Sequence, residues 1–431
     1  MTALVTPAPR RVRARRLVAG NLVARLGALV SLAAATVLVA RAGGPDMVGA
    51  FTLLRVLPGL AGVVAAAGLP GAAPFFLGTR SADPRLRPTL VALTWLGATA
   101  AAAGWLALTP ALRLVFFQSW GASMVAAAAA AVFTQLFVAV GKALLQGSGD
   151  LPGANAAIVG EEAAFLPLYL ALLPFGVGVW TMLWALVAAD VAVALVIAVR
   201  LHRVGFFAGW GRPSHRLGRR ICGYGWRGQL GGILALVNLR LDVAVLGALA
   251  GPATLGVYAV ASKYAELLRL PGQAFNYVLY PAFAARDGRD ARARTRALLA
   301  PAAGLTALAA IPLALAAGTL LPLVYGAGFR GAVVPVWILL GGLIGEGVAG
   351  VITAYFYGVG RPGLSSLAVG IGVAVTVAGD LLLIPRHGAV GAAVASSIAY
   401  LLTVATLLAC FGMTPRTRPA GPDPEDLTPK E

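Results

Sequence analysis

Only a few charged side chains lie inside the long apolar segments of this 431-residue chain. A charge at membrane depth costs several kcal/mol and therefore usually faces a polar cavity or a partner of opposite sign. Arginine binds phosphate oxygens through paired donors, and lysine offers them a point charge. The cations at membrane depth are Arg25, Arg55, Arg240 and Lys263. We therefore predict that they bind a ligand whose headgroup carries phosphate.

Carboxylates at the same depth can bind a proton or a sodium ion and couple its gradient to transport. The candidates for this ion coupling are Glu346, Glu161 and Asp242. Glu161 and Glu162 are adjacent, so we expect one to face a cavity and the other to pair with a basic residue or lie near the interface. If Glu346 serves only helix packing, we expect its partner to be a serine, a threonine or a backbone group. Asp380 is near the outer end of its span, and we expect it to be hydrated.

A purely structural role is the alternative for several of these charges. Lys263, Glu266 and Arg269 are spaced three apart, so on one helix they would lie on a single face and satisfy each other. Arg240 and Asp242 are two apart and would not face each other, so each needs a partner elsewhere.

The segments that carry these residues are membrane helices by composition. Hydrophobic residues make up 59% of the chain and charged residues 12%, whereas a soluble domain has roughly a quarter of its residues charged. A helix needs about 20 apolar residues to cross the hydrocarbon core. We predict an all-α integral membrane protein of about twelve helices. The expected spans are 17–40, 47–70, 88–108, 122–146, 153–174, 178–199, 226–249, 253–280, 298–323, 333–357, 363–384 and 388–411.

The net charge of +18 is distributed unevenly between the loops. Five arginines precede the first span, seven lie between Arg200 and Arg227, and five lie between Arg286 and Arg296. The loops on the opposite side hold only Arg41, Arg113, Arg330 and Arg386. This asymmetry predicts that both termini are cytoplasmic and that the number of spans is even. Because topology explains the basic residues, we expect no nucleic-acid partner.

From the sequence we expect no cofactor and no metal. The two cysteines are far apart and have no metal-ligand spacing. Residues 358–363 fit the pattern G-x-G-x-x-G, but they lie between two membrane helices, without the strand–turn–helix context of a dinucleotide site.

We expect five segments along the chain. They are a basic cytoplasmic N-terminus (1–16), an N-lobe of six spans (17–200), a linker (201–222), a C-lobe of six spans (223–412) and a disordered cytoplasmic tail (413–431). Phe206, Phe207 and Trp210 lie among arginines in the linker, which predicts a segment on the cytoplasmic membrane face.

The two lobes are expected to be an internal repeat. Gly44-Pro45 is followed by G-A-F at 49–51, and Gly251-Pro252 is followed by G-V-Y at 256–258, at a constant offset of 207 residues. The G-x-G at 147–149 is matched by the G-x-G at 358–360. Transporters built from repeats place the substrate path between them near mid-membrane.

Several motifs, in order, resemble those of the polysaccharide (O-antigen, Wzx-type) flippase family. That family belongs to the multidrug/oligosaccharidyl-lipid/polysaccharide (MOP) exporter superfamily, with the multidrug exporters and the lipid II flippases. The chain departs from the pattern at Gly379-Asp380, where family members often carry asparagine. The matching segments are GPDMVGAF (44–51), LDVAVLG (241–247), YGAGF (325–329), GVGRP (358–362) and IPRHGAVGAA (384–393).

The resemblance implies two six-helix lobes around a central cavity that opens to each side in turn. It implies a non-enzymatic flippase for an undecaprenyl-diphosphate oligosaccharide or polysaccharide precursor in a bacterial cytoplasmic membrane. The implied partners are the lipid-linked glycan and membrane lipids, with H⁺ or Na⁺ as candidate coupling ions and polysaccharide assembly proteins as candidate protein partners.

Three alternatives to a polysaccharide flippase differ from it in features that the sequence shows. A multidrug or organic-cation antiporter has the same architecture, but its cavity usually carries acids and aromatics rather than fixed cations. A lipid II-type flippase typically has fourteen spans. A membrane polymerase or glycosyltransferase needs a long catalytic outer loop, and the outer loops here are short.

Overall fold

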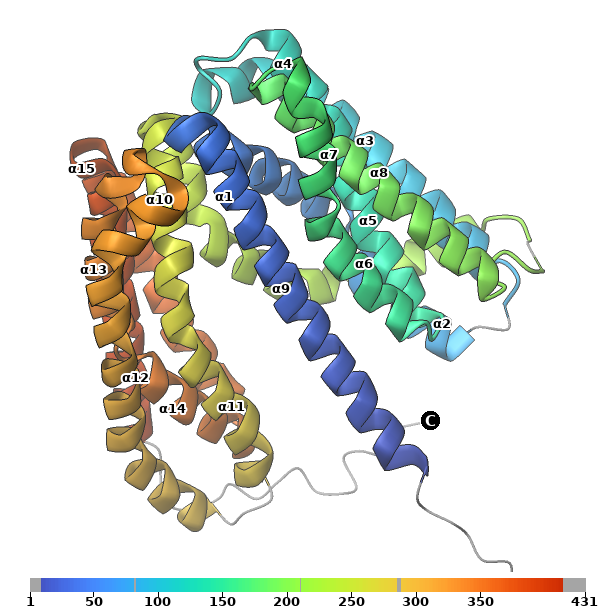
Figure 1. Ribbon diagram of the computed structural model, residues 1–431. Coiled ribbons are helices and arrows are strands. Elements are labelled where there is room, and N and C mark those ends of the chain that lie inside the picture. Colours follow the sequence, from blue (N-terminus) through green and yellow to red (C-terminus); the bar gives the residue numbers. More distant parts are fainter. Residues whose placement is uncertain (1–8, 81–82, 210, 285–287, 414–431) are drawn as a thin grey trace, which may run out of the picture. The chain divides into compact units, whose positions relative to one another are not determined.

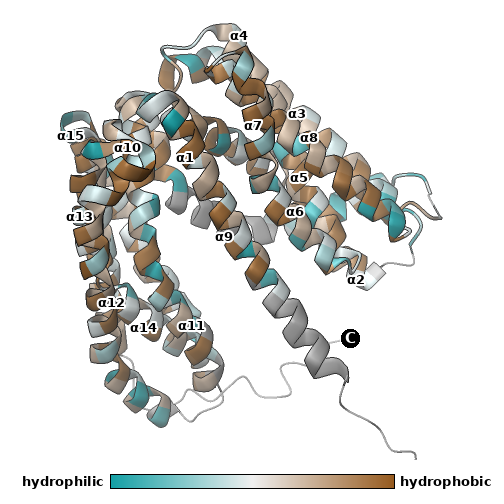
Figure 2. Ribbon diagram, in the orientation of Figure 1, coloured by the Kyte–Doolittle hydropathy of each residue, from teal (hydrophilic) through white to brown (hydrophobic). Residues whose placement is uncertain are grey.

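The computed structural model describes residues 9–80, 83–209, 211–284 and 288–413, and in these ranges the chain is helical with no strand. Large apolar side chains point outward along the helices; Leu195 is 63% exposed and Leu315 is 77% exposed. Figure 2 shows apolar residues along most of the helices. Outward-facing apolar side chains on this scale fit a lipid environment rather than water.

The helices account for twelve membrane segments. Eight stretches of the described residues are long and apolar enough to span a membrane. Two of these, Val23–Ala65 and Pro362–Met413, each contain a glycine with non-helical backbone angles, Gly44 and Gly388, and therefore hold two segments each. The remaining two segments are α9 and the α10–α11 stretch. The predicted all-α membrane fold of about twelve helices is confirmed.

The residues up to Ala253 form one compact unit and those from Thr254 a second. In the first unit, α5 packs against α3 and α8, and α1 packs against α6 (Figure 1). Its helices are α1 (Pro9–Ala65), α2 (Leu69–Arg80), α3 (Leu86–Val115), α4 (Ala122–Ala127), α5 (Ala129–Gly147), α6 (Leu151–Ala163), α7 (Phe165–Leu172), η1 (Leu173–Phe175), α8 (Val179–Arg203) and α9 (His215–Leu249).

In the second unit, α14 packs against α11, α12 and α15. Glycine allows the closest of these contacts, as is usual between membrane helices: a Cβ on Gly350 would lie 2.2 Å from the Gly272 carbonyl oxygen. The helices are α10 (Gly251–Ala265, which begins at the unit boundary), η2 (Glu266–Leu268), α11 (Arg269–Ala284), α12 (Gly288–Tyr325), η3 (Ala327–Ala332), α13 (Val333–Leu343), α14 (Glu346–Gly358) and α15 (Pro362–Met413).

The backbone at the repeated glycines agrees between the two halves of the sequence. Gly44 and Gly251, each followed by proline, have φ of 69° and 79°. The second glycines of the two G-x-G motifs, Gly149 and Gly360, have φ of 83° and 72°. Positive φ is readily adopted only by glycine, so each pair of glycines shares a backbone angle that other residues rarely adopt.

Gly44 offers a direct test of this backbone requirement. Its angles (φ 69°, ψ −162°) lie in a region that is essentially limited to glycine. An added Cβ would meet no atom within 4 Å, so any cost of Gly44→Ala is conformational. We expect this substitution to lower the free energy of unfolding by about 1–3 kcal/mol, measured by denaturation in detergent. Gly104→Ala, at a helical glycine with open space around it, is the matched control and should not destabilise the protein.

The segment between α8 and α9 is bonded to the start of α3 inside the first unit. Arg87 donates from Nη1 to the carbonyl oxygens of Gly205 (3.0 Å) and Ala208 (3.2 Å). Ser214 N donates to Thr89 Oγ1 (2.9 Å). Phe206, expected at the membrane surface, is instead 1% exposed beneath the Arg87 guanidinium, because Arg87 draws the turn inward.

Phe207 is exposed. Trp210, residues 1–8 of the predicted N-terminal segment and residues 414–431 of the predicted tail lie outside the described residues. The proposed lobe boundaries remain predictions; by its contacts, α9 lies in the first unit with α1, α2 and α3.

Candidate functional site

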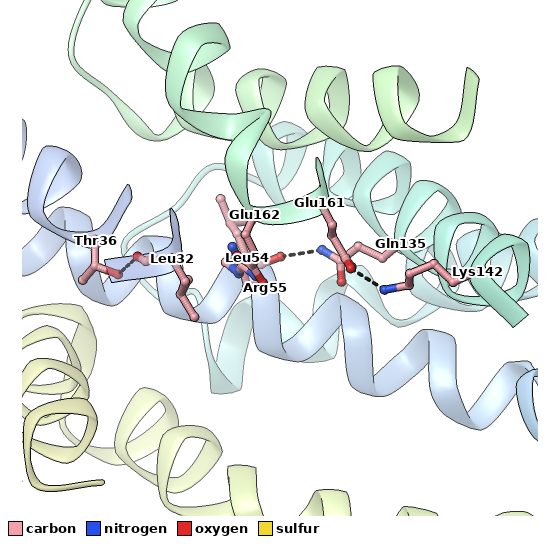
Figure 3. Close-up of polar contacts among 8 residues, drawn as sticks. All are labelled: Leu32, Thr36, Leu54, Arg55, Gln135, Lys142, Glu161 and Glu162. Atoms are coloured by element: carbon pink, nitrogen blue, oxygen red, sulfur yellow. Dashed lines mark hydrogen bonds and ion pairs between the residues drawn. The ribbon is translucent and has the colours of Figure 1, made fainter. Parts of the chain in front are cut away.

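An ion pair joins the second half of α1 to the end of α6. Arg55 Nη2 lies 2.6 Å from Glu162 Oε1, and the two side chains are 23% and 16% exposed. The Arg55 guanidinium also lies over the Phe51 ring, 5.3 Å from its centroid. Figure 3 shows this pair beside a second one, which is made by the adjacent residue Glu161. The predicted cation Arg55 is therefore held in a largely buried, polar part of the first unit.

The second pair joins α5 to α6. Lys142 Nζ bonds Glu161 Oε2 (Figure 3). Two turns before Lys142 on α5, Gln135 Nε2 donates to the Leu54 carbonyl oxygen at 3.3 Å. We define Arg55, Lys142, Glu161 and Glu162 as the paired cluster. We expected a basic partner for one of the adjacent glutamates, and the structure shows one for each.

Asp190 extends this polar region from α8 and was not among the predicted ion-coupling residues. The residue is 7% exposed. The Thr134 hydroxyl lies 2.7 Å from Asp190 Oδ2 and 3.3 Å from the Ala131 carbonyl oxygen. Thr134 and Asp190 are 56 residues apart, and no periodicity within either helix connects them; the only signal in the sequence is an acid within an apolar span.

Arg25 lies on the first half of α1 and is exposed. Its Nε donates to Asn21 Oδ1 (3.0 Å), and Asn21 Nδ2 donates to Asn155 Oδ1 of α6 (2.8 Å). Arg25 and Arg55 have different partners, Asn21 and Glu162. Both predicted cations thus lie on α1 beside α6, at separate positions.

The other predicted residues of α9 and α10 are not part of the paired cluster. Arg240 is exposed on α9, and Asp242 is partly buried and accepts a hydrogen bond from Val243 N. Lys263 is partly buried in α10 of the second unit. Helix α10 ends at Ala265 and η2 follows, so Lys263 and Arg269 do not lie on one continuous helix as the three-residue spacing predicted.

Glu346 has an arginine partner in the second unit. Arg269 Nε lies 3.9 Å from Glu346 Oε1, and the Arg269 guanidinium lies 4.8 Å from the centroid of the Tyr400 ring. The prediction that Glu346 would pair with a serine, a threonine or a backbone group was wrong. The close glycine contact between α11 and α14 brings the start of α11, which carries Arg269, against the start of α14.

Charged residues of both units lie where a membrane segment is interrupted. Glu161 and Glu162 end α6 just before α7 begins, Arg269 begins α11 after η2, and Glu346 begins α14. Broken helices of this kind surround the substrate and ion sites of many transporters.

Asp380 was expected to be hydrated, and this prediction was wrong. It is 0% exposed in α15. Small residues allow the two halves of α15 to pack closely: a Cβ on Gly379 would lie 2.8 Å from Ala395 Cβ, and one on Gly391 would lie 2.4 Å from the Leu383 carbonyl oxygen. This packing encloses the neighbouring carboxyl group.

Within the described residues, no group of three or more histidine, cysteine, aspartate or glutamate side chains is arranged to hold a metal ion.

Solved structures that resemble the chain share its fold. One is the "inward-facing conformation of a multidrug resistance MATE family transporter of the MOP superfamily", with TM-score 0.68 and 18% identity, covering 90% of this chain and 94% of that one. A second is "lipid II flippase MurJ, inward closed conformation", with TM-score 0.73 and 13% identity, covering 92% and 88%. An outward-facing MATE family transporter matches with TM-score 0.59 and 16% identity, covering 92% and 94%.

No curated protein sequence matches the chain. A family model does: the one described as "polysaccharide biosynthesis protein" matches residues 38–334, more than half of the chain. The resemblance read from the motifs is confirmed by this match, and the predicted MATE-like membrane fold by the structural matches. The chain belongs to the polysaccharide biosynthesis protein family.

Proposed function

We propose that this protein is a flippase that carries a lipid-linked (undecaprenyl-diphosphate) oligosaccharide or polysaccharide precursor across a bacterial cytoplasmic membrane by alternating access. Membership of a polysaccharide biosynthesis family and the fold shared with transporters support a carrier rather than an enzyme. The basic loops would face the cytoplasm, with both termini on that side.

The arrangement of Arg55 is the observation that carries this proposal. Its side chain is about three-quarters buried, at a depth where an unneeded cation is costly. A guanidinium has five donors, and the one hydrogen bond of Arg55 among the described residues is to Glu162. The remaining donors suit the oxygens of a diphosphate, which accept paired hydrogen bonds from arginine.

Arg25 is the second cation that we assign to the headgroup. Its exposed guanidinium is oriented at Nε by Asn21, which leaves its terminal nitrogens for a ligand. We assign Arg240 and Lys263 to the same substrate path, and Glu346, Glu161 and Asp242 to ion coupling.

The direct test is transport in reconstituted vesicles. Vesicles containing labelled undecaprenyl-diphosphate oligosaccharides should show protein-dependent movement of the label to the far leaflet. A range of glycans, lipid II among them, would identify the preferred headgroup. If no glycan moves, the flippase proposal fails, and gradient-driven uptake of organic cations by the same vesicles would instead establish the multidrug antiporter.

A further inference from the structure

We propose that Asp190 is a proton-binding site of the first unit, and that it joins Glu346, Glu161 and Asp242 in ion coupling by binding a proton rather than a metal ion. The coupling part rests on the proposed function, whereas the binding of the proton does not. The site consists of Asp190 on α8 and Thr134 on α5.

The hydrogen bonds around Thr134 suit a protonated acid. A hydroxyl has one proton, yet Thr134 Oγ1 lies within reach of two acceptors, Asp190 Oδ2 at 2.7 Å and the Ala131 carbonyl oxygen at 3.3 Å. When Asp190 is protonated, its O–H donates to Thr134 Oγ1, and the threonine hydroxyl donates to Ala131. When Asp190 is ionised, Thr134 must turn its proton to the carboxylate, and the carbonyl loses that donor.

The charges around the site also balance only when one proton is bound. The paired cluster holds two cations and two carboxylates, each joined in a pair. Asp190 is the fifth charge, and among the described residues it forms no ion pair. A buried carboxylate without a cation partner is costly, and protonation removes that cost.

The groups that face Asp190 come from every helix packed on α8. Lys142 of α5, Glu161 of α6 and Arg55 of α1 lie close enough to act on it electrostatically. Helix α7 contributes one titratable side chain, the buried Tyr169. The three charged neighbours are already paired with one another or with Glu162, so a change in the charge of Asp190 alters the field on the whole cluster.

A proton fits this site better than a sodium ion. Na⁺ needs several oxygen ligands around it, as hard cations generally do. The site offers one carboxyl, one hydroxyl and one carbonyl, and the carboxyl and hydroxyl already lie at direct hydrogen-bond distance. A proton needs only this contact.

Infrared difference spectroscopy of the full-length protein in vesicles tests proton binding without any substrate. As the pH falls from alkaline to acidic values, the wild-type protein should gain the C=O band of a carboxylic acid. In Asp190→Asn this titrating band should be lost. Asp150→Asn is the matched control: Asp150 lies in the same unit, paired with Arg200, and its substitution should leave the Asp190 band in place.

An Asp190→Asn spectrum with the same titrating bands as the wild type would overturn the proton site, whatever the substrate proves to be. A Na⁺-dependent change of the band at constant pH would overturn the choice of ion.

The coupling is tested by transport. Asp190→Asn should lose the acceleration that a pH gradient gives to glycan movement by the wild-type protein, and it should keep the slower movement that needs no gradient. If Asp190→Asn keeps that acceleration, the coupling is wrong. If the wild-type protein in vesicles moves no glycan, the proposed function fails, and the infrared spectra still test whether Asp190 binds a proton.

Discussion

Replacing Arg55 by alanine is expected to reduce transport of a lipid-linked glycan roughly 10- to 100-fold, because one hydrogen bond to a charged group contributes about 1.5–3 kcal/mol. The side chain is largely buried and is held at one nitrogen by Glu162, so its remaining donors are positioned for the diphosphate. The measurement is the initial rate of movement to the far leaflet in vesicles, at substrate concentrations well below saturation.

Arg55→Lys is the companion variant for this prediction. Lysine keeps the positive charge but replaces the planar fork with a point charge. We expect an intermediate rate, with Glu162 still neutralised. Wild-type rates in both Arg55→Ala and Arg55→Lys would remove Arg55 from the substrate path.

Gly350→Ala is expected to be among the most destabilising single substitutions in the second unit. The new Cβ would lie 2.2 Å from the Gly272 carbonyl oxygen and 2.7 Å from its carbon. Both are backbone atoms, so α11 and α14 must separate. We expect the free energy of unfolding to fall by roughly 3 kcal/mol, with a lower melting temperature in detergent and faster proteolysis.

Gly304→Ala provides the comparison for this effect. It makes the same chemical change on α12 of the same unit, where a Cβ meets no atom within 4 Å. Alanine is the better helix former, so this variant should be as stable as the wild type or slightly more stable. If Gly350→Ala has the same melting temperature as Gly304→Ala, the close contact between α11 and α14 is not as described.

The membrane fold could be predicted from the sequence, because apolar runs and the uneven distribution of basic residues are local signals. Gly44 and Gly251, each before a proline, could be recognised as equivalent positions from the sequence, and both have positive φ. Arg55 could be identified as an unusual cation from the sequence, because the residues on either side of it in the chain are apolar.

The partners of these charges could not be predicted, because they come from other helices. Glu162 lies 107 residues from Arg55, and Asp190 lies 56 residues from Thr134. The arginine opposite Glu346 depends on a close glycine contact between two helices, and the burial of Asp380 depends on how α15 folds back at Gly388. Such contacts depend on tertiary packing, which helical periodicity does not encode.

The most direct test of whether Arg55 serves the substrate or only neutralises Glu162 is transport by the double variant Arg55→Ala/Glu162→Ala. Removing both members of a buried pair avoids the strong destabilisation that one uncompensated charge causes, so the double variant should fold like the wild type. If Arg55 binds the diphosphate, the folded double variant should transport as poorly as Arg55→Ala alone. Wild-type transport by the double variant would show that the arginine only balances the glutamate, and would contradict the account.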